Sequence, residues 1–297
     1  VVEAADRLMP QQLDGGGAAM LANALKGVGI AALAATTVAS IQEDAVTLAD
    51  GTHLAAELIV VAAGIRPEIG LARGAGIDTD RGILVDDALR TSAPDVLAVG
   101  ECAEHRGTVY GLWGPLAEQA RAAGATVCGD PAGFQGAVPA TTLKVAGVDL
   151  FAGGGQAASE HQDEIVFSDG RRGTYRRLVL DGERLAGAVL VGDVSQAREL
   201  SGLLRSEDPV PQRLLAGPGE ATEAEPDPGP EATVCTCNAV TRGEIEQAIS
   251  ARGLTSVAGV AGVTRASTGC GSCTSEIEAL LRRADEPERV HRAETHA

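Results

Sequence analysis

The stretch CTCNAVTRGEIEQAI (residues 235–249), followed by STGCGSC (residues 267–273), decides the interpretation of the C-terminal part of the chain. It holds four of the six cysteines, in the pattern Cys-x-Cys, 32 residues, Cys-x-x-Cys. Thiols paired at such short spacing in a chain without an export signal indicate metal ligation more than disulfides, which stay the alternative. The expected metal ligands are Cys235, Cys237, Cys270 and Cys273.

The spacing favours iron–sulfur over zinc, because structural zinc sites usually take Cys-x2–4-Cys at both ends. Thr241-Arg-Gly-Glu244 is a capping box, which predicts a helix to about Ala251 with Gly253 beyond its end. A second helix is expected from just after Cys273 to about Arg283. The second cysteine pair would then lie at a helix N-terminus, where backbone amides and the helix dipole stabilise a negatively charged cluster.

These motifs resemble the bacterioferritin-associated-ferredoxin-like (BFD-like) [2Fe–2S] domain, whose four ligands map onto the four cysteines. The resemblance implies a small helical domain over residues 233–283 that holds a [2Fe–2S] cluster, followed by a charged tail at 284–297. The segment before it, residues 216–232, has four prolines, five acidic residues and no basic residue. This composition predicts an acidic linker.

Residues 140–215 show a sequence pattern typical of short strands separated by turns, with Asp169-Gly170 and Asp181-Gly182 as hairpin signals. The expected strands are Leu143–Val145, Glu164–Phe167, Tyr175–Leu180 and Ala186–Val191. The glycine triplets Gly15–Gly17 and Gly153–Gly155 are interpreted as loop glycines. The pattern predicts a small α+β domain, and the segment resembles the C-terminal domain of NADH–rubredoxin reductases.

Residues 65–139 follow an apolar run, Leu58–Ala63, which is expected to form a buried parallel strand ending at Gly64. Another expected strand, Val96–Val99, leads into Gly100-Glu101, and Pro115 is expected at the first position of a helix. Ligands of α/β folds bind at the carboxyl ends of such strands. Gly100 would let a backbone approach a ligand closely, and Glu101 would accept a hydrogen bond from a sugar-alcohol hydroxyl.

The stretches AVGECAEHRGTVYGL (residues 98–112) and PLAEQA (residues 115–120) carry a second resemblance. Over residues 1–130 the chain resembles the pyridine-nucleotide–disulfide-oxidoreductase superfamily, most closely the flavoprotein part of NADH-dependent nitrite reductase large subunits and the electron-transfer subunits of assimilatory nitrate reductases. The family's second flavin motif ends in Gly-Asp, whereas here it ends in Gly-Glu. The resemblance implies an FAD site with contacts from Gly64, Gly100, Glu101 and the amides of Leu116 and Ala117. His105 is expected as a proton donor beside the flavin or, alternatively, in a surface or interdomain hydrogen-bonding role.

Residues 1–64 are interpreted as a partial βαβ unit, with a helix over Leu13–Lys26 closed by Gly27. Short β segments are expected at 38–41 and 45–48, with a turn at Asp50-Gly51. Glu3 lies where a Rossmann strand 2 would end, the usual place for an acid that binds the ribose of NADH; a solvent-exposed acid is the alternative. Neither a G-x-G-x-x-G motif nor an initiator Met is present, so we expect the pyrophosphate loops to precede residue 1.

Composition and net charge further limit the class of protein and the partners to be expected. The chain has 297 residues, 44% hydrophobic content, only 2% aromatic residues and a net charge of −17. Such a balance suits glycine-rich α/β layers and argues against a nucleic-acid partner. No apolar run long enough to span a bilayer and no signal-peptide pattern is found, so we expect no membrane partner and a cytoplasmic location.

The expected fold is therefore α/β: a partial FAD/NAD(P)-binding fold, then a small α+β domain and a small helical [2Fe–2S] domain. The expected segments are 1–64, 65–139, 140–215, 216–232, 233–283 and 284–297. The expected function is electron transfer from NADH or NADPH through FAD and the [2Fe–2S] cluster to a partner such as a nitrate reductase catalytic subunit. The alternatives are a truncated large subunit of nitrite reductase, against which the charged C-terminal tail argues, and a ferredoxin-like docking or iron-handling module.

Overall fold

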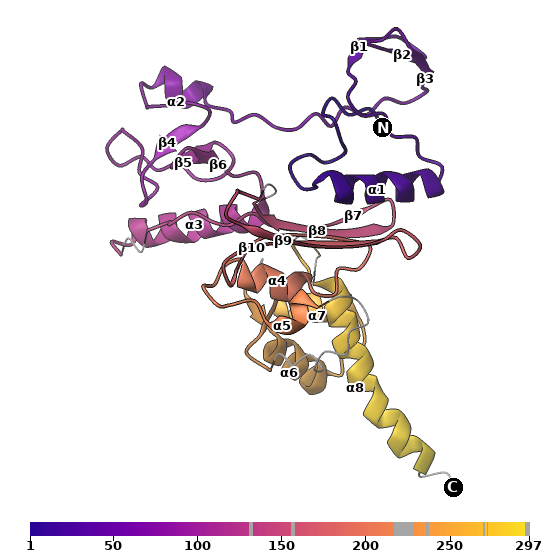
Figure 1. Cartoon of the computed structure of the whole chain (residues 1–297). Coiled ribbons are helices and arrows are strands. Elements are labelled where there is room, and N and C mark those ends of the chain that lie inside the picture. Colours follow the sequence, from indigo (N-terminus) through magenta and orange to yellow (C-terminus); the bar gives the residue numbers. More distant parts are fainter. Residues whose placement is uncertain are drawn as a thin grey trace. The chain divides into compact units, whose positions relative to one another are not determined.

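The structure is a computed structural model that divides into two compact units, Val1–Thr222 and Glu223–Ala297. It describes residues 1–130, 133–155, 158–216, 229–235, 238–269, 271 and 273–294, with only the backbone of 285–294. Figure 1 labels the helices and strands. Each unit has its own hydrophobic clusters.

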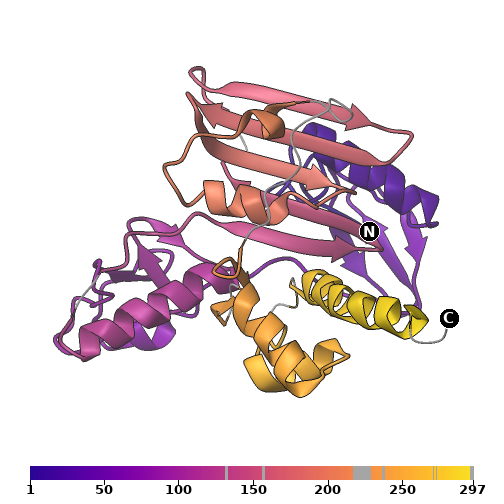
Figure 2. The ribbon, with the colours of Figure 1, turned by 90° about the horizontal axis from the view of Figure 1, so that it is seen from below.

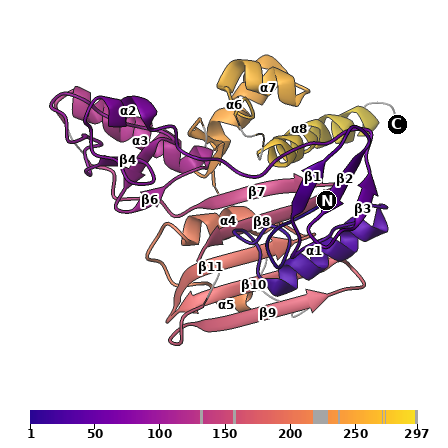
Figure 3. The same ribbon diagram turned by 90° about the horizontal axis from the view of Figure 1, so that it is seen from above.

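The first unit contains a five-stranded antiparallel sheet of order β7-β8-β11-β10-β9, whose strands are labelled in Figure 3. Its strands are β7 (Ala140–Val145), β8 (Val148–Gly154), β9 (Asp163–Asp169), β10 (Thr174–Asp181) and β11 (Arg184–Val191). The two predicted hairpins, β9–β10 and β10–β11, are confirmed. Neighbouring side chains such as Val189 and Leu190 enter separate clusters, as the alternation of a strand requires.

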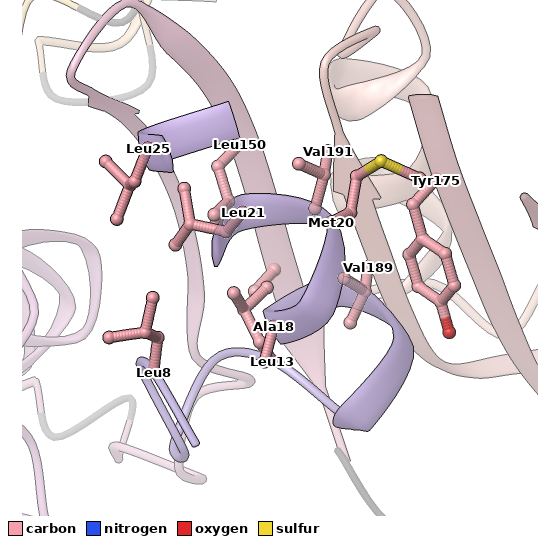
Figure 4. Packing of buried hydrophobic residues seen from close by; sticks show 11 residues of the cluster. Leu8, Leu13, Ala18, Met20, Leu21, Leu25, Leu150, Tyr175, Val189 and Val191 are labelled. Atoms are coloured by element: carbon pink, nitrogen blue, oxygen red, sulfur yellow. The ribbon is translucent and has the colours of Figure 1, made fainter. Parts of the chain in front are cut away.

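Helix α1 (Gly15–Gly27) covers one face of this sheet, and it confirms the predicted helix. Figure 4 shows the cluster between helix and sheet, where Leu21 and Leu25 of α1 share a core with Leu150 and Val189. The triplet Gly15–Gly17 is not a loop, as expected from the sequence, but the first turn of α1. A Cβ at Gly16 would lie only 2.6 Å from the Tyr175 ring, so close packing requires glycine there.

Helices α4 (Ala197–Leu203) and α5 (Gln212–Leu215) cover the opposite face, as Figures 1 and 2 show for α4. Their core contains Phe151, Leu178, Leu190, Leu200, Leu204 and Leu214. Strand β8 was not predicted, because Gly153–Gly155 was interpreted as a loop. Gly153 and Gly154 end this strand, and a Cβ at Gly154 would lie 2.2 Å from the carbonyl oxygen of Ala186. The glycines therefore serve close backbone approach.

The first unit also contains a smaller lobe between Gly70 and Phe134, with a core of Leu89, Tyr110 and Phe134. Its elements are α2 (Gly70–Gly74), β4 (Ile83–Val85), β5 (Ala103–His105), β6 (Thr108–Val109) and α3 (Trp113–Val127). Helix α3 begins two residues before Pro115, so proline takes the third helical position rather than the first. Val96–Val99 is not a strand either: only an isolated bridge joins Arg90 to Leu97, and Val96 and Val99 are about 40% exposed.

The N-terminal segment carries a three-stranded antiparallel sheet, β1 (Val38–Ile41), β2 (Ala45–Leu48) and β3 (His53–Ala55), with the predicted turn at Asp50-Gly51. The prediction of a buried strand at Leu58–Ala63 is wrong for this structure. Leu58 and Val60 are 82% and 78% exposed, and the segment has no strand assignment. A parallel strand depends on neighbouring strands, and none of the described strands pairs with this run.

The second unit contains the hairpin β12 (Thr233–Cys235) and β13 (Val240–Thr241), then helices α6 (Arg242–Arg252), α7 (Val257–Thr264) and α8 (Thr274–Glu294). The predicted capping box is confirmed, and Gly253 ends α6 in the left-handed conformation. Helix α8 continues beyond Arg283 through much of the expected charged tail. Within the described part of the chain, no helix is long and apolar enough to cross a bilayer.

Candidate functional site

Two of the four predicted metal ligands lie in one apolar core. Cys235 ends β12 and is 2% exposed, and Cys273 directly precedes α8 and is 5% exposed. Both belong to the cluster that contains Ile245, Val260 and Ile277. The other two predicted ligands, Cys237 and Cys270, lie outside the described residues.

The loop between α7 and α8 leads to Cys273 and has an unusual backbone. Arg265 and Ser267 both have a φ of 66°, a region that residues other than glycine rarely adopt. The Thr274 hydroxyl donates to the Gly271 carbonyl at 2.7 Å and lies 2.8 Å from the Ser267 hydroxyl. These bonds join the start of α8 to Ser267 and Gly271 of the loop.

Asn238 connects this loop to the first cysteine pair, and the sequence analysis did not single it out. Its side-chain amide nitrogen is 2.8 Å from the Arg265 carbonyl oxygen and 3.2 Å from Thr268 Oγ1. The same nitrogen lies 3.7 Å from the sulfur of Cys235. Asn238 thus holds the two parts of the site together and directs a donor at a candidate ligand. The sequence does not reveal this contact, because Asn238 and Arg265 are 27 positions apart.

The residues present fit an iron–sulfur cluster. Thiolates are the ligands such clusters require, and their burial in an apolar core together with a donor to sulfur is the environment that tunes them. Cys235 is a free thiol in the structure. Cys273 lies at the N-terminal end of α8, where the helix dipole favours negative charge. No group of three metal-ligating side chains occurs in the described residues, which include only two of the four cysteines.

In the first unit, the Gly100–Glu101 turn has a defined geometry. The Gly100 amide donates to the Gln119 side-chain oxygen at 2.9 Å, and the Gly100 carbonyl accepts from the Ala103 amide at 3.1 Å. The φ of Gly100 is +96°, which strongly favours glycine. A Cβ there would meet no atom within 4 Å, so space is open at the turn, and Glu101 beside it is exposed.

The start of α3 lies near another predicted contact, Gly64. A Cβ at Gly111, one residue before the N-cap Leu112, would lie 3.3 Å from Cδ1 of Ile65, the residue after Gly64. Leu112 makes no side-chain cap. The backbone amides of Trp113 and Gly114, in the first turn of α3, have no acceptor carbonyl within the helix.

Leu116 and Ala117, the predicted flavin contacts, lie further along α3. The Leu116 amide already donates to the Leu112 carbonyl at 3.3 Å, and the Leu116 side chain packs against the core of Leu89 and Phe134. Trp113 and Gly114 are therefore additional candidates that the sequence analysis missed, because it placed the helix start at Pro115.

These residues fit one end of a flavin. The helix start offers amide donors and a positive dipole, Glu101 offers an exposed carboxylate, and the turn leaves open space. Gln119 is fully buried, and its Nε2 has no hydrogen-bond partner within the part of the chain that is described.

His105 is buried, which contradicts the surface position among its expected roles and leaves the interdomain role untested. It is 1% exposed, its Nε2 lies 2.9 Å from an Asp87 carboxylate oxygen, and its ring packs on Phe134. Arg106 also donates to Asp87, at 2.6 Å and 3.0 Å. These hydrogen bonds, that of Arg106 first and that of His105 second, hold the pKa of the Asp87 carboxyl below its usual value. The contacts of Asp87 and His105 therefore hold the segment around Phe134 against the rest of the lobe.

Glu3, the predicted ribose-binding acid, makes local hydrogen bonds within the N-terminal segment. Its carboxylate accepts from the Ala5 amide at 2.9 Å, its backbone amide donates to Leu33, and its carbonyl accepts from Thr36. Val2 forms a parallel bridge with Leu33. Glu3 therefore follows a short strand-like contact, with a carboxylate that is half-buried in a local turn.

Three family models match consecutive parts of the chain. Residues 1–125 match the pyridine nucleotide-disulphide oxidoreductase model, and residues 139–208 match the rubredoxin NAD+ reductase C-terminal domain. Residues 233–283 match the BFD-like [2Fe-2S] binding domain. The first model implies FAD and NAD(P)H as cofactors, and the third implies a [2Fe–2S] cluster.

Curated relatives match nearly the whole chain. The assimilatory nitrate reductase electron transfer subunit of Bacillus subtilis is 39% identical over 93% of this chain and 37% of its own length. A nitrite reductase [NAD(P)H] of the same organism is 36% identical over 95% of this chain and 36% of its own length. The chain thus spans about a third of the length of these relatives.

Among solved structures, the covalent putidaredoxin reductase–putidaredoxin complex matches with a TM-score of 0.63 and 25% identity. The match covers 72% of this chain and 54% of the other.

Proposed function

Because the chain carries a pyridine nucleotide-disulphide oxidoreductase segment and a BFD-like [2Fe-2S] binding domain, we propose that it is part of an NAD(P)H- and FAD-dependent electron-transfer oxidoreductase. Electrons pass from NAD(P)H through FAD to the [2Fe–2S] cluster and on to a partner reductase in the cytoplasm. The partner we propose is a nitrate reductase catalytic subunit, in nitrate assimilation. The observation that carries the proposal is the pair of buried cysteines, one at a helix start, in the same chain as a flavoprotein segment.

Different residues of the chain bind the flavin and the nicotinamide cofactor in this proposal. When bound, FAD supplies the conversion of a two-electron hydride into the single electrons that an iron–sulfur cluster carries. Gly100 and Glu101 receive the ribityl region, and the start of α3, with Leu116 and Ala117 behind it, stabilises negative charge at the pyrimidine edge. Gly64 borders the same helix start. Glu3 binds the ribose of the nicotinamide cofactor.

The cluster is held by Cys235, Cys237, Cys270 and Cys273, and Asn238 donates toward the first of these sulfurs. We propose that residues 216–232 link the cluster domain, 233–283, to a rubredoxin-reductase-like domain over 140–215. An acidic, proline-rich linker supplies a high effective concentration of the cluster near the flavin without fixing one geometry. The partial NAD-binding and FAD-binding segments are 1–64 and 65–139.

A second candidate is the flavoprotein part of a nitrite reductase large subunit. The observation that favours it is the similar identity of nitrite reductases, 36% and 37%, over 95% of this chain. The terminal acceptor distinguishes the two candidates, because nitrate reduction by an added catalytic subunit supports only the first. A ferredoxin-like iron-handling module, a third candidate, would not be reduced by NAD(P)H.

The experiment that tests the metal assignment is iron and acid-labile sulfide analysis of anaerobically purified protein. We expect both in equal amounts, at two per chain for one [2Fe–2S] cluster. Cys235→Ser and Cys270→Ser should abolish the visible iron–sulfur absorption, whereas Cys128→Ser, at an exposed position outside the motif, should leave it intact. Stoichiometric zinc without acid-labile sulfide would overturn the assignment.

A further inference from the structure

Gln119 is a fully buried polar residue in the middle of α3. Its side-chain oxygen accepts the amide of Gly100 at 2.9 Å, nineteen positions earlier in the chain. This bond joins the two elements to which the proposed function assigns flavin contacts: the Gly100–Glu101 turn and helix α3.

A second hydrogen bond lies within the turn itself, so it does not fix the position of the turn relative to α3. The Gly100 carbonyl accepts from the Ala103 amide, which closes the turn on itself. Thr126 of α3 also bonds to a neighbouring loop: its hydroxyl donates to the Ala88 carbonyl at 2.9 Å. Thr126 lies at the far end of α3, so Gln119 is the polar contact nearest the turn that relates it to the helix.

The choice of glutamine is not explained by stability alone. Its Nε2 is buried and has no hydrogen-bond partner among the described residues. An apolar side chain of similar volume would remove the unsatisfied Nε2 but would take the acceptor from the Gly100 amide, and such local conflicts concentrate at functional sites. The oxygen, by contrast, satisfies the amide of a residue whose φ of +96° orients the following Glu101.

We propose that Gln119 is a positioning residue: it sets the spacing between the Gly100–Glu101 turn and the start of α3, and thereby the fit of the flavin. This inference rests on the proposed function. Gln119 itself does not touch the flavin, because its side chain is fully buried. It acts by holding the Gly100 amide, so that Glu101 is presented at a fixed distance from the helix start.

The test compares Gln119→Met, which keeps the volume but removes the acceptor, with Thr126→Val as a matched control on the same helix. The first measurement is hydrogen exchange of the Gly100 amide in the flavin-free chain. We expect Gln119→Met to speed exchange at Gly100 at least about tenfold, because the amide loses its acceptor, and Thr126→Val to leave it unchanged. Unchanged exchange in Gln119→Met would overturn the positioning role.

The second measurement is the dissociation constant of FAD and the visible circular dichroism of the bound flavin in the flavin-loaded protein. We expect Gln119→Met to weaken FAD binding about tenfold and to change the dichroism, whereas Thr126→Val changes neither. Equal affinity and dichroism in wild type and Gln119→Met would overturn the inference while the proposed function stands. Absence of FAD binding in the unaltered full-length protein, which carries the expected pyrophosphate loops, would instead overturn the proposed function, independently of the exchange result.

Discussion

Replacing Asn238 with alanine should weaken the cluster domain and shift the reduction potential of its cluster. The amide nitrogen of Asn238 has two hydrogens and three acceptors within reach. The two nearer acceptors are the Arg265 carbonyl at 2.8 Å and Thr268 Oγ1 at 3.2 Å, and the third is the Cys235 sulfur at 3.7 Å. The substitution removes the tie between the loop that leads to Cys273 and the first cysteine pair.

The geometry sets the size of both effects. Two exposed hydrogen bonds of about 0.5–1 kcal/mol each give a loss of roughly 1–2 kcal/mol. For a unit of this size, each kcal/mol lowers Tm by about 4–8 °C. The long contact between Asn238 and the Cys235 sulfur is expected to stabilise the reduced cluster by about 0.5–1 kcal/mol. This free energy corresponds to roughly 20–45 mV in a one-electron reduction potential. Without this donor, the potential becomes more negative.

The assay is thermal unfolding together with a redox titration of the cluster, and Thr241→Ala is the matched control. Thr241 caps α6 in the same unit, and loss of such a cap costs about 0.5–2 kcal/mol. Both variants should therefore lose similar stability, but only Asn238→Ala should shift the potential. Equal potentials in Asn238→Ala, Thr241→Ala and wild type would refute the argument that Asn238 acts on the cluster.

Two further predictions concern the first unit. The Tyr175 hydroxyl donates to Asp14 at 2.6 Å, and burial first, then this bond, raises the pKa of Tyr175. Its stabilising contribution is complete below about pH 10 and is lost as the pH rises above that value. Tyr175→Phe should therefore lower stability at neutral pH and flatten the alkaline decline in urea unfolding; an unchanged alkaline decline would contradict this. The lowered pKa of Asp87 gives the opposite dependence, because its contribution is present above about pH 4 and is lost on acidification. Asp87→Asn should speed hydrogen exchange around Phe134 at pH 7 and remove the acid-sensitive part of that exchange. Wild-type exchange at pH 7 in this variant would contradict the stabilising role of the Asp87 carboxylate.

Elements encoded by neighbouring residues were predictable from the sequence. The capping box at Thr241 and Glu244 places its donors and acceptors within one helical turn, so the pattern alone specifies the start of α6. The β9–β10 and β10–β11 hairpins are similarly local, since their turn residues adjoin the paired strands.

Elements that depend on distant partners were not predictable. Leu58–Ala63 has the composition of a buried strand, but composition does not specify which neighbour a parallel strand pairs with, and the run is exposed. Gly154 could be recognised as part of β8 only from its contact with Ala186 on the paired strand. The same holds for the candidate site: Gln119 meets Gly100 across nineteen residues, and Asn238 meets Arg265 across twenty-seven.

We propose that one protein passes electrons from NAD(P)H through FAD to a [2Fe–2S] cluster. The most direct test is stopped-flow reduction of the anaerobic, flavin-loaded protein by NADH and by NADPH, with the cluster followed by visible absorption and by electron paramagnetic resonance of freeze-quenched samples. We predict that flavin bleaching precedes appearance of the reduced-cluster signal, and that Cys235→Ser retains the first event and loses the second. A cluster that stays oxidised after the flavin has been fully reduced would contradict the account.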